Sequence, residues 1–161
     1  MKRVLALTAL FAATVVLTGR VPAQGPGMAD PPFKKDDVWK GPLTQIGKYK
    51  TDTSVPAEFT CEFKITALKN KDMEFDAQLK ETAGKLEVTY LVSGKLTAED
   101  NGFSFTFTSS GVAPDSVKRT EPLTGITYTG KITGKEMNGT WEYKKMPEDT
   151  DLSGTVKFKK Q

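Results

Sequence analysis

The residues of this sequence that could do chemistry are aromatic residues, carboxylates and one thiol, because the chain contains no histidine. Without an imidazole it lacks the usual general base, the Ser-His-Asp and Cys-His nucleophile systems, and histidine-ligated zinc or iron sites. The single cysteine, Cys61, shares one side of a predicted strand with Phe59, Phe63 and Ile65. A thiol in apolar surroundings has a raised pKa, so we expect Cys61 to pack in the core rather than to act as a nucleophile.

Four carboxylates could supply a glycosidase-like pair of acid and base: Glu62, Glu74, Asp76 and Glu87. Each of them alternates with apolar residues and shares its side of a predicted strand with lysines and threonines. We therefore assign these carboxylates to the solvated outer surface of a sheet.

The stretch "DTDLSGTV" at residues 149–156 has the spacing of the first half of an EF-hand calcium loop. The position that should supply a bidentate glutamate is Lys160, and the ninth position is Lys157. Two ammonium groups would repel the ion, so we interpret this stretch as a turn that enters the last strand. The sequence predicts no metal site and no cofactor.

A set of aromatic side chains shares the inward parity of the predicted strands: Tyr90, Phe105, Tyr128, Trp141 and Tyr143. One interpretation is core packing. The other is that the tyrosine hydroxyls and the indole N–H line a ligand pocket at one mouth of a barrel, since buried polar tips need partners. In the stretch 109–122, Lys118 and Arg119 would meet an acidic group on the ligand if that stretch is a lid; the alternative is an ordinary surface loop.

The elements that position these residues are strands, because apolar and polar residues alternate with period two along most of the chain. The alternation runs through residues 59–66, 73–81, 86–92, 103–107, 126–132, 141–143 and 152–158, with a weaker strand around 46–51. The segments "KNK", "ETAG", "EDNG" and "GKE" are short enough for hairpins, so strands that are neighbours in sequence should pair. The pattern predicts an all-β antiparallel meander of about eight strands.

Four glycines recur in small polar-Gly-x-apolar segments and share the inward parity: Gly94, Gly130, Gly139 and Gly154. A missing side chain on the concave face lets a strand coil sharply or lets a large neighbour lean across it. Such bends curl a meander into a barrel. We therefore predict a closed or nearly closed barrel, with a two-sheet sandwich as the second choice.

Recurrent Ser/Thr-Gly-x-apolar strands behind an export signal resemble the avidin and lipocalin group of up-and-down barrels, over residues 43–160. The resemblance implies a small ligand in the barrel mouth. The lipocalin Gly-x-Trp belongs on the first strand, whereas here it is Gly139-Thr140-Trp141, late in the chain. Avidin-type pockets use several tryptophans, and we expect Trp39 to lie outside the strands, so biotin binding is not implied.

Residues 1–23 have the features of a secretory signal peptide: Lys2 and Arg3, an apolar run over 4–17, and small residues at Val21 and Ala23. The alternative, an uncleaved anchor, needs about 20 apolar residues. The segment holds three of the 23 basic residues and no acidic one, so 20 of each remain and the mature net charge is zero. A nucleic-acid partner, which requires a clustered basic surface, is not expected, and neither is a membrane span after cleavage.

These observations predict a protein exported to the periplasm or the extracellular space. Residues 24–42, rich in proline and glycine, should form a flexible segment, and residues 43–161 a single barrel domain. The leading hypothesis is a non-enzymatic binding module for a small apolar molecule. The alternative is a structural or protein-interaction domain with a filled core and no ligand. The sequence predicts no particular oligomeric state.

We expect the exported protein to begin at or near Gln24, because Val21 and Ala23 occupy the positions that a signal peptidase reads. N-terminal sequencing of the protein recovered from outside the cytoplasm checks this cleavage. A chain that still starts at Met1 would contradict it.

Overall fold

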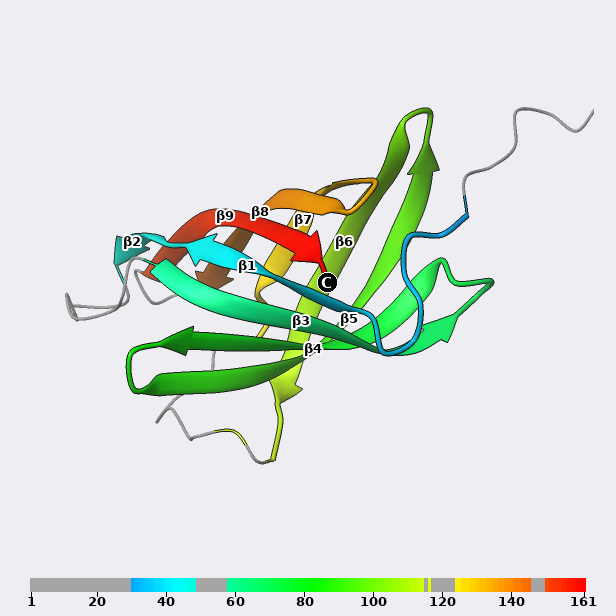
Figure 1. Ribbon diagram of the computed structural model, residues 1–161. Helices are drawn as coiled ribbons and strands as arrows, with labels where there is room; N and C mark the ends of the chain where they lie inside the picture. Colours follow the sequence, from blue (N-terminus) through cyan, green and yellow to red (C-terminus); the bar gives the residue numbers. More distant parts are fainter. Residues whose placement is uncertain (1–29, 49–57, 115, 117–123, 146–149) are drawn as a thin grey trace, which may run out of the picture.

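The computed structural model describes residues 30–48, 58–114, 116, 124–145 and 150–161. All regular elements in these ranges are β-strands, in agreement with the predicted all-β class (Figure 1). The same residues include no helix with the length and hydropathy that a membrane crossing requires.

The strands form one antiparallel sheet that closes on itself. They are β1 (Val38–Thr44), β2 (Ile46–Lys48), β3 (Glu58–Lys69), β4 (Glu74–Ala83), β5 (Leu86–Glu99), β6 (Gly102–Val112), β7 (Thr127–Thr133), β8 (Glu136–Lys145) and β9 (Thr150–Lys160). From β3 to β9 each strand pairs with the next, and β1 pairs with both β3 and β9. β2 continues β1 beyond Gln45 and also pairs with β9, so the wall is an eight-stranded meander barrel and not a two-sheet sandwich.

The predicted start of the barrel at residue 43 is wrong. Residues 38–42 belong to β1, and the Trp39 side chain, expected outside the strands, is completely buried. Gly41 and Pro42 suggested a flexible segment, but Trp39 and Leu43 alternate toward the interior and their burial drives the strand. The weaker strand expected around 46–51 is β2 as far as Lys48, and the remainder lies outside the described residues.

Phe33 closes one end of the barrel. The centroid of its ring lies 5.7 Å from that of Trp39, 4.9 Å from that of Phe75 and 6.1 Å from that of Phe63. The segment that carries it is held on β3 by two backbone hydrogen bonds of 3.0 Å, from the Asp36 N–H to the Ile65 carbonyl and from the Ile65 N–H to the Asp37 carbonyl. This end of the interior is therefore sealed by residues that precede β1.

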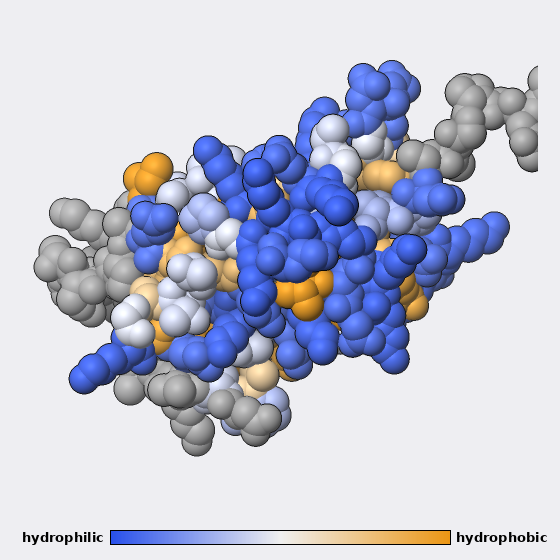
Figure 2. Space-filling model, in the orientation of Figure 1, coloured by the Kyte–Doolittle hydropathy of each residue, from blue (hydrophilic) through white to orange (hydrophobic). Residues whose placement is uncertain are grey.

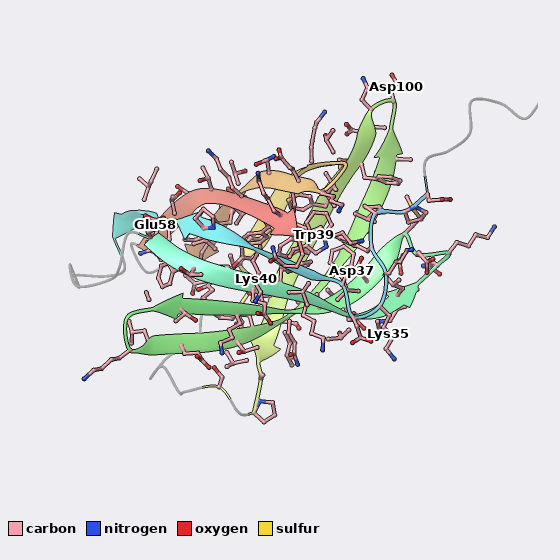
Figure 3. The ribbon with its side chains drawn as sticks, in the orientation of Figure 1. Lys35, Asp37, Trp39, Lys40, Glu58 and Asp100 are labelled. Atoms are coloured by element: carbon pink, nitrogen blue, oxygen red, sulfur yellow. The ribbon has the colours of Figure 1, made fainter. Side chains whose placement is uncertain are left out.

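Two interactions of Lys160, at the end of β9, hold the same segment, and we call them the Lys160 clamp. The Lys160 ammonium pairs with the Asp37 carboxylate at 2.5 Å and donates a hydrogen bond of 3.1 Å to the Pro32 carbonyl. Both charged side chains are largely buried, with exposed fractions of 22% and 15%. Figure 3 shows Asp37 and Trp39 close together where the chain enters β1.

Aromatic rings form a continuous column from Phe33 toward the other end. The ring centroids of Phe63 and Phe107 are 5.0 Å apart, and those of Phe107 and Tyr128 are 4.5 Å apart in a stacked arrangement. Tyr128 in turn lies 6.5 Å from Trp141. Each such pair contributes about 0.5–1.5 kcal/mol beyond its area of burial, so the column both fills and stabilises the barrel.

The predicted hairpins connect β3 to β4, β4 to β5, β5 to β6 and β7 to β8, as expected. The β5–β6 hairpin extends beyond the barrel body, and Asp100 marks its tip (Figure 3). The long link predicted over 109–122 lies further along the chain, between Val112 at the end of β6 and Thr127 at the start of β7, because β6 continues to Val112 by pairing with Tyr90 of β5.

The inward parity of the four glycines is confirmed. Gly130 and Gly139 lie opposite each other on β7 and β8, and the tip of the Phe105 ring covers both. A Cβ on either glycine would lie 2.8 Å from the ring carbon Cζ of Phe105, closer than real side chains approach. The two strands therefore make room for a core ring by omitting two side chains.

We expect Gly139→Ala to lower the free energy of unfolding by at least about 2 kcal/mol, because the added methyl group overpacks a rigid site. Its Cβ would collide with the Thr129 carbonyl as well as with Phe105. Urea unfolding of the mature protein measures the change. Gly111→Ala on β6 is the matched control, since its Cβ meets nothing within 4 Å and should change stability by less than about 0.5 kcal/mol. Equal effects of the two substitutions would contradict the packing explanation.

Candidate functional site

The end of the barrel away from Phe33 contains a buried carboxylate. Glu81 on β4 is only 8% exposed, and the remaining buried residues of the described chain are apolar or aromatic except Ser109. The Tyr128 hydroxyl donates a hydrogen bond of 3.4 Å to Glu81 Oε1. Burying a carboxylate is costly in free energy unless it is paired or hydrogen-bonded. The hydrogen bond from Tyr128 therefore offsets part of the cost of burying Glu81.

The strand pattern explains why Glu81 faces inward. It follows Ala77 and Leu79 at the same parity on β4, and it lies opposite Cys61 on β3. The sequence analysis missed this residue, although extending the predicted inward alternation by one step beyond Leu79 identifies it. Sequence reasoning placed carboxylates outside as a class, and Glu81 is the exception.

Burial, together with the charge of Glu81, raises the pKa values of two groups beside this carboxylate. Burial, and then the charge of Glu81, raise the pKa of the Cys61 thiol far above its usual value. Burial raises the pKa of Tyr128 in the same way, followed by the effects of Glu81, Tyr90 and Cys61. Both groups therefore stay protonated at neutral pH, and the Tyr128 hydroxyl remains a donor to the carboxylate.

A cavity of about 10 Å³ lies at this end of the barrel. It is lined by Leu43, Gln45, Glu81, Tyr90, Ile126, Tyr128 and Trp141. A volume of this size holds about one water molecule. The described side chains around this cavity therefore leave little free space between them.

The predicted ligand-binding residues divide into three groups. Tyr90, Tyr128 and Trp141 come together around the small cavity. Phe105 stacks on Phe107 at 5.5 Å in the column, and Tyr143 is buried, but neither lines this cavity. Lys118 and Arg119 lie outside the described residues.

The two described ends of the predicted lid meet on one rim of the barrel. The Ser109 N–H donates to the Ile126 carbonyl at 2.9 Å, and the Ile126 N–H donates to Ser109 Oγ at 3.0 Å. Val112 is half-buried against the core at the end of β6. Ser109 and Ile126 thus lie side by side on this rim, whereas a lid function of the link stays a prediction.

The predicted outer carboxylates lie on the outer surface of the barrel. Glu62 pairs with Lys40 at 2.9 Å, Asp76 with Lys69 at 2.6 Å, and Glu87 with Lys80 at 2.9 Å. Glu74 is exposed as well. On this side of the barrel, over β1 and β3–β5, opposite charges neutralise one another in exposed pairs, which contribute little to stability.

A larger hollow of about 470 Å³ lies on the opposite outer surface, and we call it the outer groove. Its lining comes from β7, β8, β9 and β2: Ile46, Thr127, Thr129, Thr140, Trp141, Glu142, Ser153, Gly154 and Thr155. The strand register arranges the side chains in two rows. Thr129, Thr140 and Thr155 are successive partners in one row, and Thr127, Glu142, Ser153 and Ile46 form the other.

Trp141 belongs to both sites, since it lines the interior cavity and the outer groove. Its indole N–H donates a hydrogen bond of 2.8 Å to the Thr44 carbonyl at the break between β1 and β2. A side chain on Gly154 would collide with both partners of this bond. The missing side chain of Gly154 thus leaves room for the indole to reach Thr44.

No protein-family model matches the sequence, and no curated protein matches it either. The functional interpretation therefore depends on the residues at the interior end of the barrel and in the outer groove.

We expect Cys61 to react with a disulfide reagent at least about a hundred-fold more slowly in the folded protein than in guanidinium chloride, because it is 1% exposed. The raised pKa adds to this protection: a free thiol ionises near pH 8.5, whereas the native Cys61 should stay protonated and unreactive at pH 9. Absorbance of the released thiolate follows the reaction. Rapid labelling of the folded protein would show that Cys61 is not buried in the core.

Proposed function

We propose that this protein is an exported, non-enzymatic β-barrel domain that acts through its outer surface. The observation that carries the proposal is the filled interior. Its aromatic column begins at Phe33 and ends at Tyr128 and Trp141, and the cavity beside these last two residues measures about 10 Å³. An eight-stranded barrel can either be filled by its own side chains or hold one small ligand, and this packing favours the first state.

The chemistry of the interior supports a non-enzymatic role. Glycoside hydrolysis generally uses two carboxyl groups at a defined separation, and the described interior offers Glu81. The Cys61 thiol is held in its protonated form by burial, which makes it a poor nucleophile. The hydrogen bond between Tyr128 and Glu81 is therefore interpreted as a structural contact at the end of the core.

The second candidate is a ligand-binding barrel of the avidin and lipocalin kind. The closed eight-stranded meander is compatible with it, and Tyr90, Tyr128 and Trp141 gather at one end. A small apolar molecule would then bind between these aromatic rings, with Lys118 and Arg119 above it. Binding of this kind requires side chains to move, because the present cavity is too small for more than about one water molecule.

Native mass spectrometry of the protein purified from its own host distinguishes the two candidates. We expect the mass of the bare mature chain, because the interior is occupied by its own side chains. The matched control is the same sample measured under denaturing conditions, which releases non-covalent ligands. A stoichiometric small molecule that is present in the native spectrum and absent from the denatured one would overturn the proposal in favour of the ligand-binding barrel.

A further inference from the structure

We propose that the outer groove binds an uncharged, polyhydroxylated ligand, namely a saccharide chain. The inference rests on the proposed function, since it assigns a ligand class to the outer surface. The groove volume of about 470 Å³ lies within the range of about 300–1,000 Å³ that is usual for small-molecule sites.

The lining of the outer groove consists mainly of hydroxyl groups. Thr129, Thr140 and Ser153 are exposed and project from three neighbouring strands. Each hydroxyl can donate one hydrogen bond and accept others, which matches the mixed donor and acceptor character of sugar hydroxyls. Neighbouring strands lie about 4.8 Å apart, and successive side chains on one face are separated by about 6.8 Å, so the two rows offer a regular lattice of such groups.

The charge of the groove selects against other ligands. Its lining contains no lysine or arginine among the described residues, and its one charged member, Glu142, is acidic. Among these described lining residues, a phosphate or carboxylate ligand would find no cation. This composition contrasts with the opposite side of the barrel, where Lys–Glu and Lys–Asp pairs cover the strands. In Figure 2 hydrophilic residues, in blue, dominate the centre and right, whereas paler residues gather at the left.

Apolar surface in the groove completes the match. Ile46 on the short strand β2 is 68% exposed, the highest value among the large hydrophobic residues. Trp141, which is only 4% exposed, lies beneath this surface with its indole N–H on the Thr44 carbonyl. Sugar rings present apolar C–H faces beside their hydroxyls, so a saccharide can contact Ile46 while it hydrogen-bonds to the threonine rows.

A sheet-stabilising role for the threonines is the competing explanation, because cross-strand Thr–Thr pairs stabilise antiparallel sheets. Thr44 and Thr155 do form such a contact, with their hydroxyl oxygens 2.8 Å apart. Replacing threonine by valine separates the two roles. Valine keeps the β-branched shape and the strand propensity but removes the hydroxyl that a ligand needs.

The test is NMR titration of the ¹⁵N-labelled mature protein with three neutral oligosaccharides, maltohexaose, cellohexaose and chitohexaose, and with an anionic oligogalacturonate. We expect at least one neutral probe to shift the amide signals of Thr129, Thr140 and Ser153. The double variant Thr129→Val/Thr140→Val should bind that probe about ten-fold more weakly, because two hydrogen bonds are lost. The control Thr60→Val, on the exposed face of β3, should bind as the parent does.

Three outcomes would overturn the inference: no groove shifts with any neutral probe at millimolar concentration, tighter binding of the anionic probe, or unchanged affinity of the double variant. The unfolding midpoint of the double variant verifies that it is folded. Failure of the titration together with a bare mass in the native spectrum would reject the saccharide groove and leave the outer-surface function standing. A ligand found inside the barrel would reject the proposed function separately.

Discussion

The close approach of β7 and β8 around the Phe105 ring is the constraint on which the rest of the barrel depends. Positions 130 and 139 are glycines, so no side chain occupies the space where this ring lies across the two strands. Because Phe105 occupies that space, Phe107 can stack between it and Tyr128, and the aromatic column can reach both ends of the interior. Protein cores are packed like organic crystals, so a change at the glycine pair would spread along the whole column.

If the interior is filled as proposed, the outer surface distinguishes this barrel from others. On β1 and β3–β5 the outward residues form exposed ion pairs that neutralise one another. The residues of β7–β9 that line the outer groove are mostly hydroxylated. The two sides therefore differ in the partners that they could attract, although the same alternation builds both. Trp141 lies in the interior, and its indole N–H reaches the Thr44 carbonyl at the break between β1 and β2.

Local patterns predicted most of the fold, and features that depend on pairing between distant strands escaped prediction. Alternation placed Cys61, Phe63 and Tyr128 in the core correctly, because the period of a strand is local. Trp39 was misplaced because its burial depends on pairing with Lys160 of β9, on the far side of the sequence. The outer groove could not be predicted either, since its rows exist only once the register of four strands is known. Glu81 is a different case, in which the local signal was present and a general rule about carboxylates concealed it.

The closure of the sheet between β1 and β9 has a consequence for the order of folding. Trp39 pairs with Lys160 and Leu43 with Val156, so the first strand cannot complete its hydrogen bonds until the last one has formed. Contacts between such distant residues carry a large loop-closure entropy and are slow to form. The hairpins from β3 to β6 can assemble earlier from neighbouring segments. The Lys160 clamp on Asp37 and Pro32 then acts as a latch that engages only when the barrel is complete.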